Sequence, residues 1–237
     1  MTLPALDVNR LSPPVPLIET QSTEPDAKQV IRHLAHEMRQ PLSALESLAY
    51  YLDIILPQSE WKARQQIDRI QQLVTQTNWI VDDAIHYLQA VAPNPVPVCL
   101  DDLITQTIME RGPGRTLRLD LDLAAEPCLA LVDRAQAHHL LANIVAFLRH
   151  HADPETPVAL ATAHRGESVE LTAHARTSSL QPADLPGLFD PFHVRLPAGA
   201  GLSLACAKRI AEAHRGSLSA VLSEVGALTI NLRLPAA

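Results

Sequence analysis

The sequence has no cluster of basic residues, few cysteines and no long apolar segment. Lysine and arginine total 19 against 26 aspartate and glutamate residues, giving a net charge of −7 and a pI near 5.8. Nucleic acid is therefore not an expected partner, because phosphate backbones require clustered Lys and Arg. The longest apolar run, residues 140–148, is interrupted by Asn143 and is too short to span a bilayer. Without a signal-peptide pattern either, we expect no membrane insertion and a cytoplasmic location.

The cysteines and paired histidines do not form a recognisable ligand pattern. Cys99, Cys128 and Cys206 are odd in number and widely spaced in apolar contexts, which indicates buried thiols rather than disulfides or metal ligands. The histidine pairs at 138–139 and 150–151 have no acidic or cysteine partner at ligand spacing, so the sequence predicts no metal site around them. With 237 residues, 47% of them hydrophobic, the chain can form one large or two modest packed domains.

Residues 36–42, His-Glu-Met-Arg-Gln-Pro-Leu, combine a nucleophile, an acid–base group and a helix-bending proline. Apolar residues recur around them at intervals of three and four, which predicts a helix that packs against other helices: Ile31, Leu34, Met38, Leu42, Leu45, Leu48, Leu52 and Ile55. His36 projects off this apolar seam and should be exposed. Its neutral imidazole is a competent nucleophile, which Glu37 could orient and deprotonate. The alternative is an ordinary exposed His-Glu pair on an amphipathic helix.

A second apolar series follows a turn predicted at residues 57–60: Ile67, Ile70, Val74, Thr77, Val81, Ala84, Leu88 and Val91. Two such helices form an αα-hairpin. A hairpin with one apolar seam per helix usually buries that seam against a second copy of itself, so we expect self-association.

Proline-rich segments mark the predicted domain boundaries. Residues 1–25 contain five prolines and few periodic apolar positions, which indicates a disordered leader. Three prolines at 93–97 end the second helix and form a stiff linker. We therefore divide the chain into the leader (1–25), a helical hairpin (26–92), the linker (93–97) and a second domain (98–237).

Beyond the linker, short alternating runs replace the long helices. Strands are predicted at 115–121, 128–132, 158–163, 168–173, 217–222 and 227–234, and helices at 135–149 and 202–214. Residues 223–226, Ser-Glu-Val-Gly, have the composition of a hairpin turn between the last two strands. This mixture predicts an α/β sandwich with helices on one face of the sheet.

The pattern at residues 36–42 resembles, residue for residue, the phosphoacceptor box of the sensor histidine kinases of two-component systems, His-Glu-x-Arg-x-Pro-Leu. The order of elements after the linker resembles the ATP-binding domain of the same family, so that the resemblance covers about residues 28–236. It implies an α+β chain of two domains, a helical hairpin forming a homodimeric four-helix bundle followed by an α/β sandwich of the histidine kinase ATPase type. It also implies that His36 is the nucleophile and phosphoryl carrier.

The family's asparagine box, usually Asn-Leu-Leu-x-Asn, appears here as His-Leu-Leu-Ala-Asn at residues 139–143. Its second Asn, which in the family helps hold the magnesium bridging the nucleotide phosphates, survives as Asn143. The first is replaced by His139. A capped or solvated helix residue is the alternative interpretation of Asn143.

The first glycine-rich box of the family, Asp-x-Gly-x-Gly-Ile, corresponds to residues 175–180, counted back from the Leu-Phe-Asp-Pro-Phe segment at 188–192. Ala175 cannot accept the adenine hydrogen bond through a side chain, a loss of about 1.5–3 kcal/mol or roughly ten- to a hundredfold in affinity. The Cβ atoms of Thr177 and Ser179 crowd the same pocket. ATP as a cofactor is therefore doubtful.

The second glycine-rich box is better preserved at residues 199–205. Gly199 and Gly201 precede a predicted helix, whose N-terminal N–H groups can meet phosphate oxygens, although a plain turn before a helix has the same pattern. The loop between Phe192 and Gly199 is short compared with the family's lid, and Arg195 is its obvious cation.

Three functions are compatible with these features. The first is a histidine phosphotransferase, in which His36 exchanges a phosphoryl group with a response-regulator aspartate; the intact phosphoacceptor box and the damaged adenine pocket favour it. The second is a soluble ATP-dependent histidine autokinase, which Asn143 and the second glycine-rich box support. The third is a non-catalytic dimeric interaction protein.

In both catalytic alternatives the residues around His36 have assigned roles. Glu37 orients His36 and manages its proton, and Arg39 either steadies phosphate oxygens or forms a surface ion pair. Gln40 occupies the position where phosphatase-competent relatives often carry Thr or Asn to orient a water. The implied partner is a response-regulator receiver domain, whose acidic pocket holds most of the expected Mg. Asn143 would be a Mg ligand only if nucleotide binds.

Overall fold

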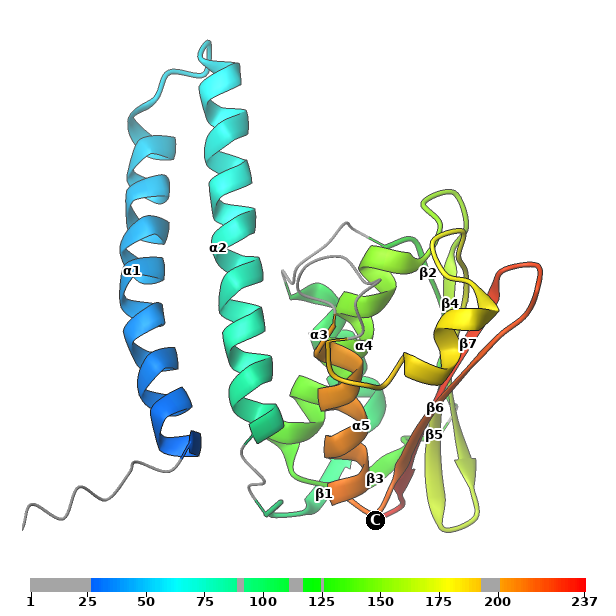
Figure 1. Ribbon diagram of the computed structural model, residues 1–237. Helices are drawn as coiled ribbons and strands as arrows, with labels where there is room; N and C mark the ends of the chain where they lie inside the picture. Colours follow the sequence, from blue (N-terminus) through cyan, green and yellow to red (C-terminus); the bar gives the residue numbers. More distant parts are fainter. Residues whose placement is uncertain (1–26, 89–91, 111–116, 125, 193–200) are drawn as a thin grey trace, which may run out of the picture.

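Helices α1 (Ala27–Ile55) and α2 (Trp61–Leu88) form an antiparallel hairpin that leads into a mixed α/β domain (Figure 1). The structure is a computed structural model that describes residues 27–88, 92–110, 117–124, 126–192 and 201–237. The predicted leader, residues 1–25, lies outside these ranges, as do Arg195 and Gly199.

Both predicted helices of the hairpin are confirmed, and α1 continues through Pro41. Ile67, Val74 and Val81 of the predicted α2 seam are buried. Arg64 closes the turn between the helices, because its Nη1 donates to the main-chain carbonyl of Asp53 at 2.8 Å. Nη2 of the same side chain forms an ion pair with the Asp53 carboxylate at 2.6 Å.

Helix α1 buries a different face from the one that carries most of its large apolar residues. Ala35 and Ala49 are buried on α1, whose tertiary contacts are with α2. Six residues of the predicted seam are exposed, and together we call them the apolar stripe of α1: Leu34, Met38, Leu45, Leu48, Leu52 and Ile55. In the single chain, the apolar stripe of α1 is therefore exposed, although its spacing is typical of a face that packs against another helix.

The second domain contains three helices, seven strands and one 3₁₀ turn in its described residues. They are β1 (Val96–Cys99), α3 (Leu100–Met109), β2 (Leu119–Asp122), β3 (Leu129–Val132), α4 (Arg134–His151), β4 (Val158–Arg165), β5 (Ser168–Arg176), η1 (Pro182–Gly187), α5 (Ser203–Ala213), β6 (Ser217–Leu222) and β7 (Ala227–Pro235). All eight strands and helices predicted beyond the linker are present, with shifted ends.

The main sheet has the strand order β2-β4-β5-β7-β6, in which β2 pairs with β4 in parallel and the other pairs are antiparallel. Strands β1 and β3 form a separate antiparallel pair. Helices α3, α4 and α5 cover one face of the main sheet, and α2 lies on their outer side (Figure 1). The core between helices and sheet includes Phe147, Leu148, Leu171, Ile230 and Leu232, all no more than 3% exposed. This layered arrangement is the α/β sandwich that the sequence predicts.

Three elements were not predicted: the strand β1, the helix α3 and the 3₁₀ turn η1. Val96 and Pro97, which belong to the predicted linker, lie in β1, where Pro97 pairs with Leu131 of β3. Proline is tolerated there because, among the strands that the structure describes, β3 alone pairs with β1 and the other edge of β1 is free. No helix in the described part of the chain combines the length and apolar character needed to cross a membrane.

Candidate functional site

His36 lies on the exposed surface of α1, as the sequence predicts. The carboxylate of Glu37 lies 3.9 Å from Nε2 of His33, one helical turn earlier, and both side chains are more than half exposed. The orienting role of Glu37 toward His36 stays a prediction. Gln40 is also exposed on α1.

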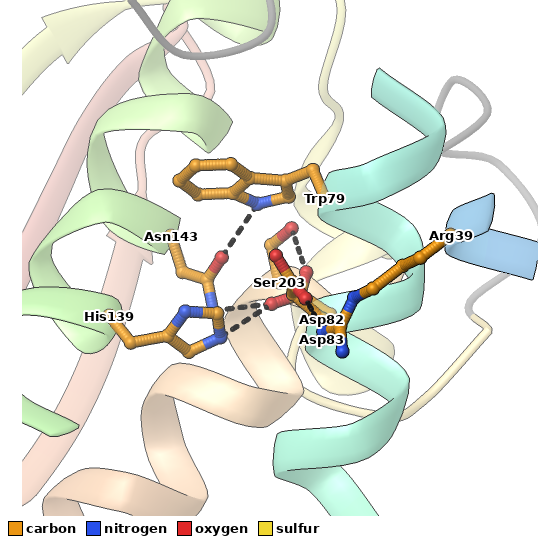
Figure 2. Close-up of polar contacts among 7 residues, drawn as sticks. All are labelled: Arg39, Trp79, Asp82, Asp83, His139, Asn143 and Ser203. Carbon is orange, nitrogen blue, oxygen red and sulfur yellow. Dashed lines mark hydrogen bonds and ion pairs between the residues drawn. The ribbon is translucent and has the colours of Figure 1, made fainter. Parts of the chain in front are cut away.

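Arg39 links α1 to α2 through an ion pair with Asp82 (Figure 2). Of the two roles that the sequence left open for Arg39, this arrangement is the surface ion pair. Both side chains are nearly half exposed, so the pair is worth at most about 1 kcal/mol and can be exchanged for other partners.

Asp83, the next residue on α2, is fully buried where α2 meets α4 and α5. Its Oδ1 accepts a hydrogen bond from Nδ2 of Asn143 at 2.8 Å and lies 3.0 Å from Nε2 of His139. Its Oδ2 accepts a hydrogen bond from the Ser203 hydroxyl at 2.8 Å. One carboxylate therefore joins the hairpin to two helices of the second domain (Figure 2).

Asn143 is also fully buried, and both halves of its amide are used by α2. While its nitrogen donates to Asp83, its Oδ1 accepts a hydrogen bond from the indole Nε1 of Trp79 at 2.9 Å. Asn143 is therefore not a solvated helix residue. The atom that would bind magnesium in the family points at a tryptophan of the hairpin (Figure 2).

His139 of α4 also contacts α2 through its ring. Its ring stacks on that of His86 from α2, with 4.1 Å between the ring centroids. Burial lowers the pKa of His86, and His139 lowers it further. On the other side, burial raises the pKa of the Cys206 thiol far above its usual range, with a contribution from Asp83. This part of the structure holds a dense set of ionisable groups.

The second glycine-rich box contributes Ser203, the first residue of α5, just after Gly201. The carboxylate of Asp83 thus lies at the N-terminal end of α5, where the helix dipole favours negative charge. In the family this is the region expected to meet nucleotide phosphates. Gly199, the other predicted phosphate contact, lies outside the described residues.

The residues that replace the first glycine-rich box bond to the end of α4. Ala175 is buried in β5, opposite Leu228 of β7. The main-chain N–H and hydroxyl of Ser178 both donate to Asp153 Oδ1, at 2.9 and 2.8 Å. The hydroxyl of Ser179 lies 2.9 Å from Nδ1 of His151. The polar groups at this position are therefore directed to the protein itself.

His151 is 3% exposed at the end of α4 and packs against the ring of Phe147, with 4.5 Å between centroids. Burial lowers the pKa of His151 to about 4, with His150 acting in the same direction and Asp184 opposing it. The imidazole is therefore neutral at physiological pH, and it serves as a packing and hydrogen-bonding group.

Sequence reasoning missed Asp83, Trp79 and Ser203 as members of the site. One signal was available for Asp83, because two acidic residues, Asp82 and Asp83, stand between Val81 and Ala84 of the predicted apolar seam. No acidic residue or cysteine stands at ligand spacing from His139 in the sequence. The structure supplies both, Asp83 and Cys206, from helices distant in the chain.

Residues 132–237 match the model of a family described as histidine kinase-, DNA gyrase B- and HSP90-like ATPases. The chain therefore carries a histidine-kinase-type ATPase domain, preceded by a helical N-terminal region. Domains of this family bind ATP, usually with magnesium.

Curated relatives align over most of the chain. It is 29% identical over 227 residues to a bacteriophytochrome of Pseudomonas aeruginosa, covering 88% of this chain and 29% of the relative. It is 28% identical over 227 residues to the sensor histidine kinase TrcS of Mycobacterium tuberculosis (88% and 43%), and 26% identical over 216 residues to the signal transduction histidine-protein kinase BaeS of Escherichia coli (85% and 45%). The chain spans less than half the length of these relatives.

Solved structures share the fold. Full-length ShkA in complex with AMPPNP superposes with a TM-score of 0.67 at 18% identity, covering 89% of this chain and 46% of that one. The histidine kinase AdeS of Acinetobacter baumannii gives a TM-score of 0.52 at 16% identity, with coverages of 84% and 97%. These likenesses concern the backbone arrangement only.

The residues present do not fit a magnesium nucleotide in the arrangement described above. Ala175 offers no carboxylate to an adenine, and the amide of Asn143 is bonded to Asp83 and Trp79. Ser203, at the phosphate end of α5, is bonded to Asp83 as well. Two side chains at the position that the family uses for nucleotide, Asn143 and Ser203, are therefore bonded to α2 of the same chain.

Proposed function

We propose that this chain is a two-component phosphorelay protein in which His36 carries a phosphoryl group and exchanges it with an aspartate of a response-regulator receiver domain. The observation that carries the proposal is a contrast within one structure. The phosphoacceptor residue His36 is exposed, whereas Asn143, the expected magnesium ligand, is buried under α2. The chain is then a histidine phosphotransferase with a degenerate ATP site.

The transfer needs little covalent work from the protein. A ring nitrogen of neutral His36 attacks the phosphorus of an aspartyl phosphate in line, the P–O bond to the aspartate breaks, and the P–N bond of phosphohistidine forms. The aspartate leaves as a carboxylate. Glu37 is proposed to orient the imidazole and to take up the proton from its other nitrogen as charge develops.

Arg39 and Gln40 are proposed as auxiliary groups on the same helix turn. Arg39 can leave its exposed ion pair with Asp82 to meet phosphate oxygens at low cost. The carboxamide of Gln40 is proposed to position a water for dephosphorylation of the regulator. A Gln40→Ala variant that dephosphorylates its regulator at an unchanged rate would remove that part of the proposal.

The apolar stripe of α1 supports a homodimer as the working form. Its six exposed apolar residues have the spacing of a helix-packing seam, and a second hairpin would bury them in a four-helix bundle. His36 lies off this stripe and would stay accessible to a docked receiver domain. Magnesium is then expected mainly in the acidic pocket of that partner.

The test is transfer of phosphoryl groups to His36 without ATP. The purified chain is incubated with phosphoramidate, a small donor that phosphorylates histidine, and acid-labile phosphohistidine is located by mass spectrometry and ³¹P NMR. We expect His36→Gln to abolish the signal. The matched control is His33→Gln, which removes an exposed histidine one turn earlier on α1 and should retain it.

Receiver domains from the source organism are then added to the phosphorylated chain. Transfer to at least one receiver that depends on His36 supports the phosphotransferase. If no receiver accepts the group and His36→Gln behaves like the unmodified chain, the protein is the non-catalytic interaction protein.

A soluble autokinase is the second candidate, and the retention of Asn143 and of the second glycine-rich box favours it. It requires α2 to release Asn143 and Ser203 so that nucleotide can enter. Labelling from γ-phosphate-labelled ATP with magnesium distinguishes the two. His36-dependent labelling would establish the autokinase, and its absence alongside successful receiver transfer would establish the phosphotransferase.

A further inference from the structure

Three different metal-binding side chains meet where α2, α4 and α5 converge. A carboxylate oxygen of Asp83, a ring nitrogen of His139 and Sγ of Cys206 all lie within 4.8 Å of one another. Asp83 and Cys206 are fully buried, and the side chain of His139 is 14% exposed. Each residue comes from a separate helix, so tertiary packing alone creates the group.

We propose that Asp83, His139 and Cys206 form a binding site for one divalent cation of the zinc class. The proposal is independent of the proposed phosphotransfer, because none of the three residues is assigned a role in that chemistry.

The separations suit a tetrahedral ion. Asp83 Oδ1 and His139 Nε2 are 3.0 Å apart, close to the roughly 3.3 Å that separates two ligands at about 2.0 Å from one tetrahedral zinc. Sγ of Cys206 lies within 4.8 Å of both atoms, so a shift of roughly 1 Å at most, which side-chain rotation can supply, allows a zinc–sulfur bond of about 2.3 Å. Three protein ligands would leave a fourth position for water.

The donor set decides the class of metal. A carboxylate, an imidazole and a thiolate together are typical of zinc and cobalt, whereas magnesium takes oxygen ligands and keeps several waters. The proposed site therefore differs from a magnesium site at Asn143, which would exist only with a bound nucleotide. Asn143 would not bind the zinc-class ion itself. Its amide would hold the metal ligand Asp83 in place, because it donates a hydrogen bond to the Asp83 carboxylate (Figure 2).

The electrostatics of Asp83 also favour a cation. This fully buried carboxylate accepts hydrogen bonds from Asn143 and Ser203. In the described residues, the ion pair recorded for it is with His139, and no Lys or Arg side chain pairs with it. A buried carboxylate is costly unless it is paired or coordinates a metal. A divalent ion would neutralise the carboxylate together with the Cys206 thiolate, and the thiol proton would be released to solvent.

Cobalt(II) is the probe, because thiolate coordination gives a near-ultraviolet charge-transfer band and tetrahedral geometry gives intense visible bands. The full chain is stripped of metal with a chelator and titrated with Co²⁺, then with Zn²⁺. We expect one cobalt per chain, both sets of bands, and displacement of cobalt by zinc.

Two variants and one control assign the ligands. Cys206→Ser should abolish the charge-transfer band, and His139→Asn, which introduces the residue of the family box, should weaken cobalt binding at least tenfold. The control is Cys128→Ser, which removes another fully buried free cysteine and should leave the bands unchanged. Circular dichroism checks that each variant is folded.

The absence of a charge-transfer band from the folded, unmodified chain would overturn the proposal. A band that persists in folded Cys206→Ser, or that disappears in folded Cys128→Ser, would overturn it as well. The His139→Asn variant keeps the test decisive if Cys206→Ser fails to fold: unchanged cobalt affinity in that variant rules out this ligand set.

Discussion

The carboxylate of Asp83 accepts a hydrogen bond from the amide of Asn143 at 2.8 Å, across the junction between α2 and α4. Asn143 is the one Asn that the family's asparagine box retains in this chain, and Asp83 belongs to the hairpin that carries His36, the proposed phosphoacceptor. The relationship joins the hairpin to the second domain through the asparagine that the family uses as a magnesium ligand. The contribution of this contact to the interface can be tested by replacing Asp83.

Replacement of Asp83 by Ala should destabilise the protein strongly. The amide of Asn143 and the hydroxyl of Ser203 would lose their buried acceptor, and His139 would lose its charged partner. We expect the free energy of unfolding to fall by about 3 kcal/mol. Urea denaturation followed by circular dichroism measures the loss.

The matched control is Asp82→Ala at the adjacent position. Asp82 pairs with Arg39 near the surface, so we expect a loss of less than about 1 kcal/mol. Equal losses in the two variants would contradict the central role assigned to Asp83.

A charge in the apolar stripe of α1 should prevent self-association. Leu48 is 59% exposed in the single chain, and the proposed dimer buries it. Light scattering after size exclusion should give a dimer mass for the unmodified chain and a monomer mass for Leu48→Glu, because a buried unpaired carboxylate is costly.

Val221→Glu is the control for that substitution. Val221 is 60% exposed on β6 and lies far from the stripe in the fold, so this variant should stay dimeric. A monomeric unmodified chain, or dimers of Leu48→Glu as stable as those of the unmodified chain, would refute the proposed bundle.

Acid should destabilise the protein through His151. Its folded pKa of about 4 lies below the usual histidine value of 6.5, so the unfolded chain binds more protons between these values. The stabilisation due to neutral His151 is complete above about pH 6.5 and falls by on the order of 3 kcal/mol as the pH drops to about 4. Urea unfolding across this range measures it.

The comparison variant is His151→Gln, whose amide can still bond to Ser179 without titrating. We expect a flatter profile for it between pH 4 and 6.5. His174→Gln, at an exposed position on β5, controls for the substitution itself. Parallel profiles for the unmodified chain and His151→Gln would show that this histidine does not carry the effect.

Two glycines with left-handed backbones should tolerate alanine very differently. At Gly226, φ is +76° and a Cβ atom would lie 2.4 Å from the carbonyl oxygen of Thr177, whereas Gly166, with φ +63°, has open space around it. We expect Gly166→Ala to cost about 1 kcal/mol through strain alone. Gly226→Ala should cost roughly 1 to 3 kcal/mol more, because the backbone must shift. Thermal and urea unfolding compare the pair, and similar losses would contradict this account.

Periodicity predicted most of the secondary structure, because local side-chain patterns encode it. The strand predicted at 217–222 is β6 with the same ends, and the strand predicted at 227–234 is β7 with one further residue. The misses have a local cause: prolines at 93–97 indicated a linker, although Val96 and Pro97 form part of β1. A strand with one neighbour tolerates proline, and its pairing with β3 is not visible in sequence.

By itself, the sequence determined the helical hairpin, the exposure of His36 and the loss of an acidic side chain at Ala175. These properties depend on residue type and local spacing, and both can be read directly from the sequence. The tertiary structure decided which groups meet: Asp83 with Asn143 and Ser203, and His139 with Cys206. These partners come from three helices, and only the packing of α2 on α4 and α5 brings their side chains into contact, because hydrogen bonds and metal coordination act over a few ångströms.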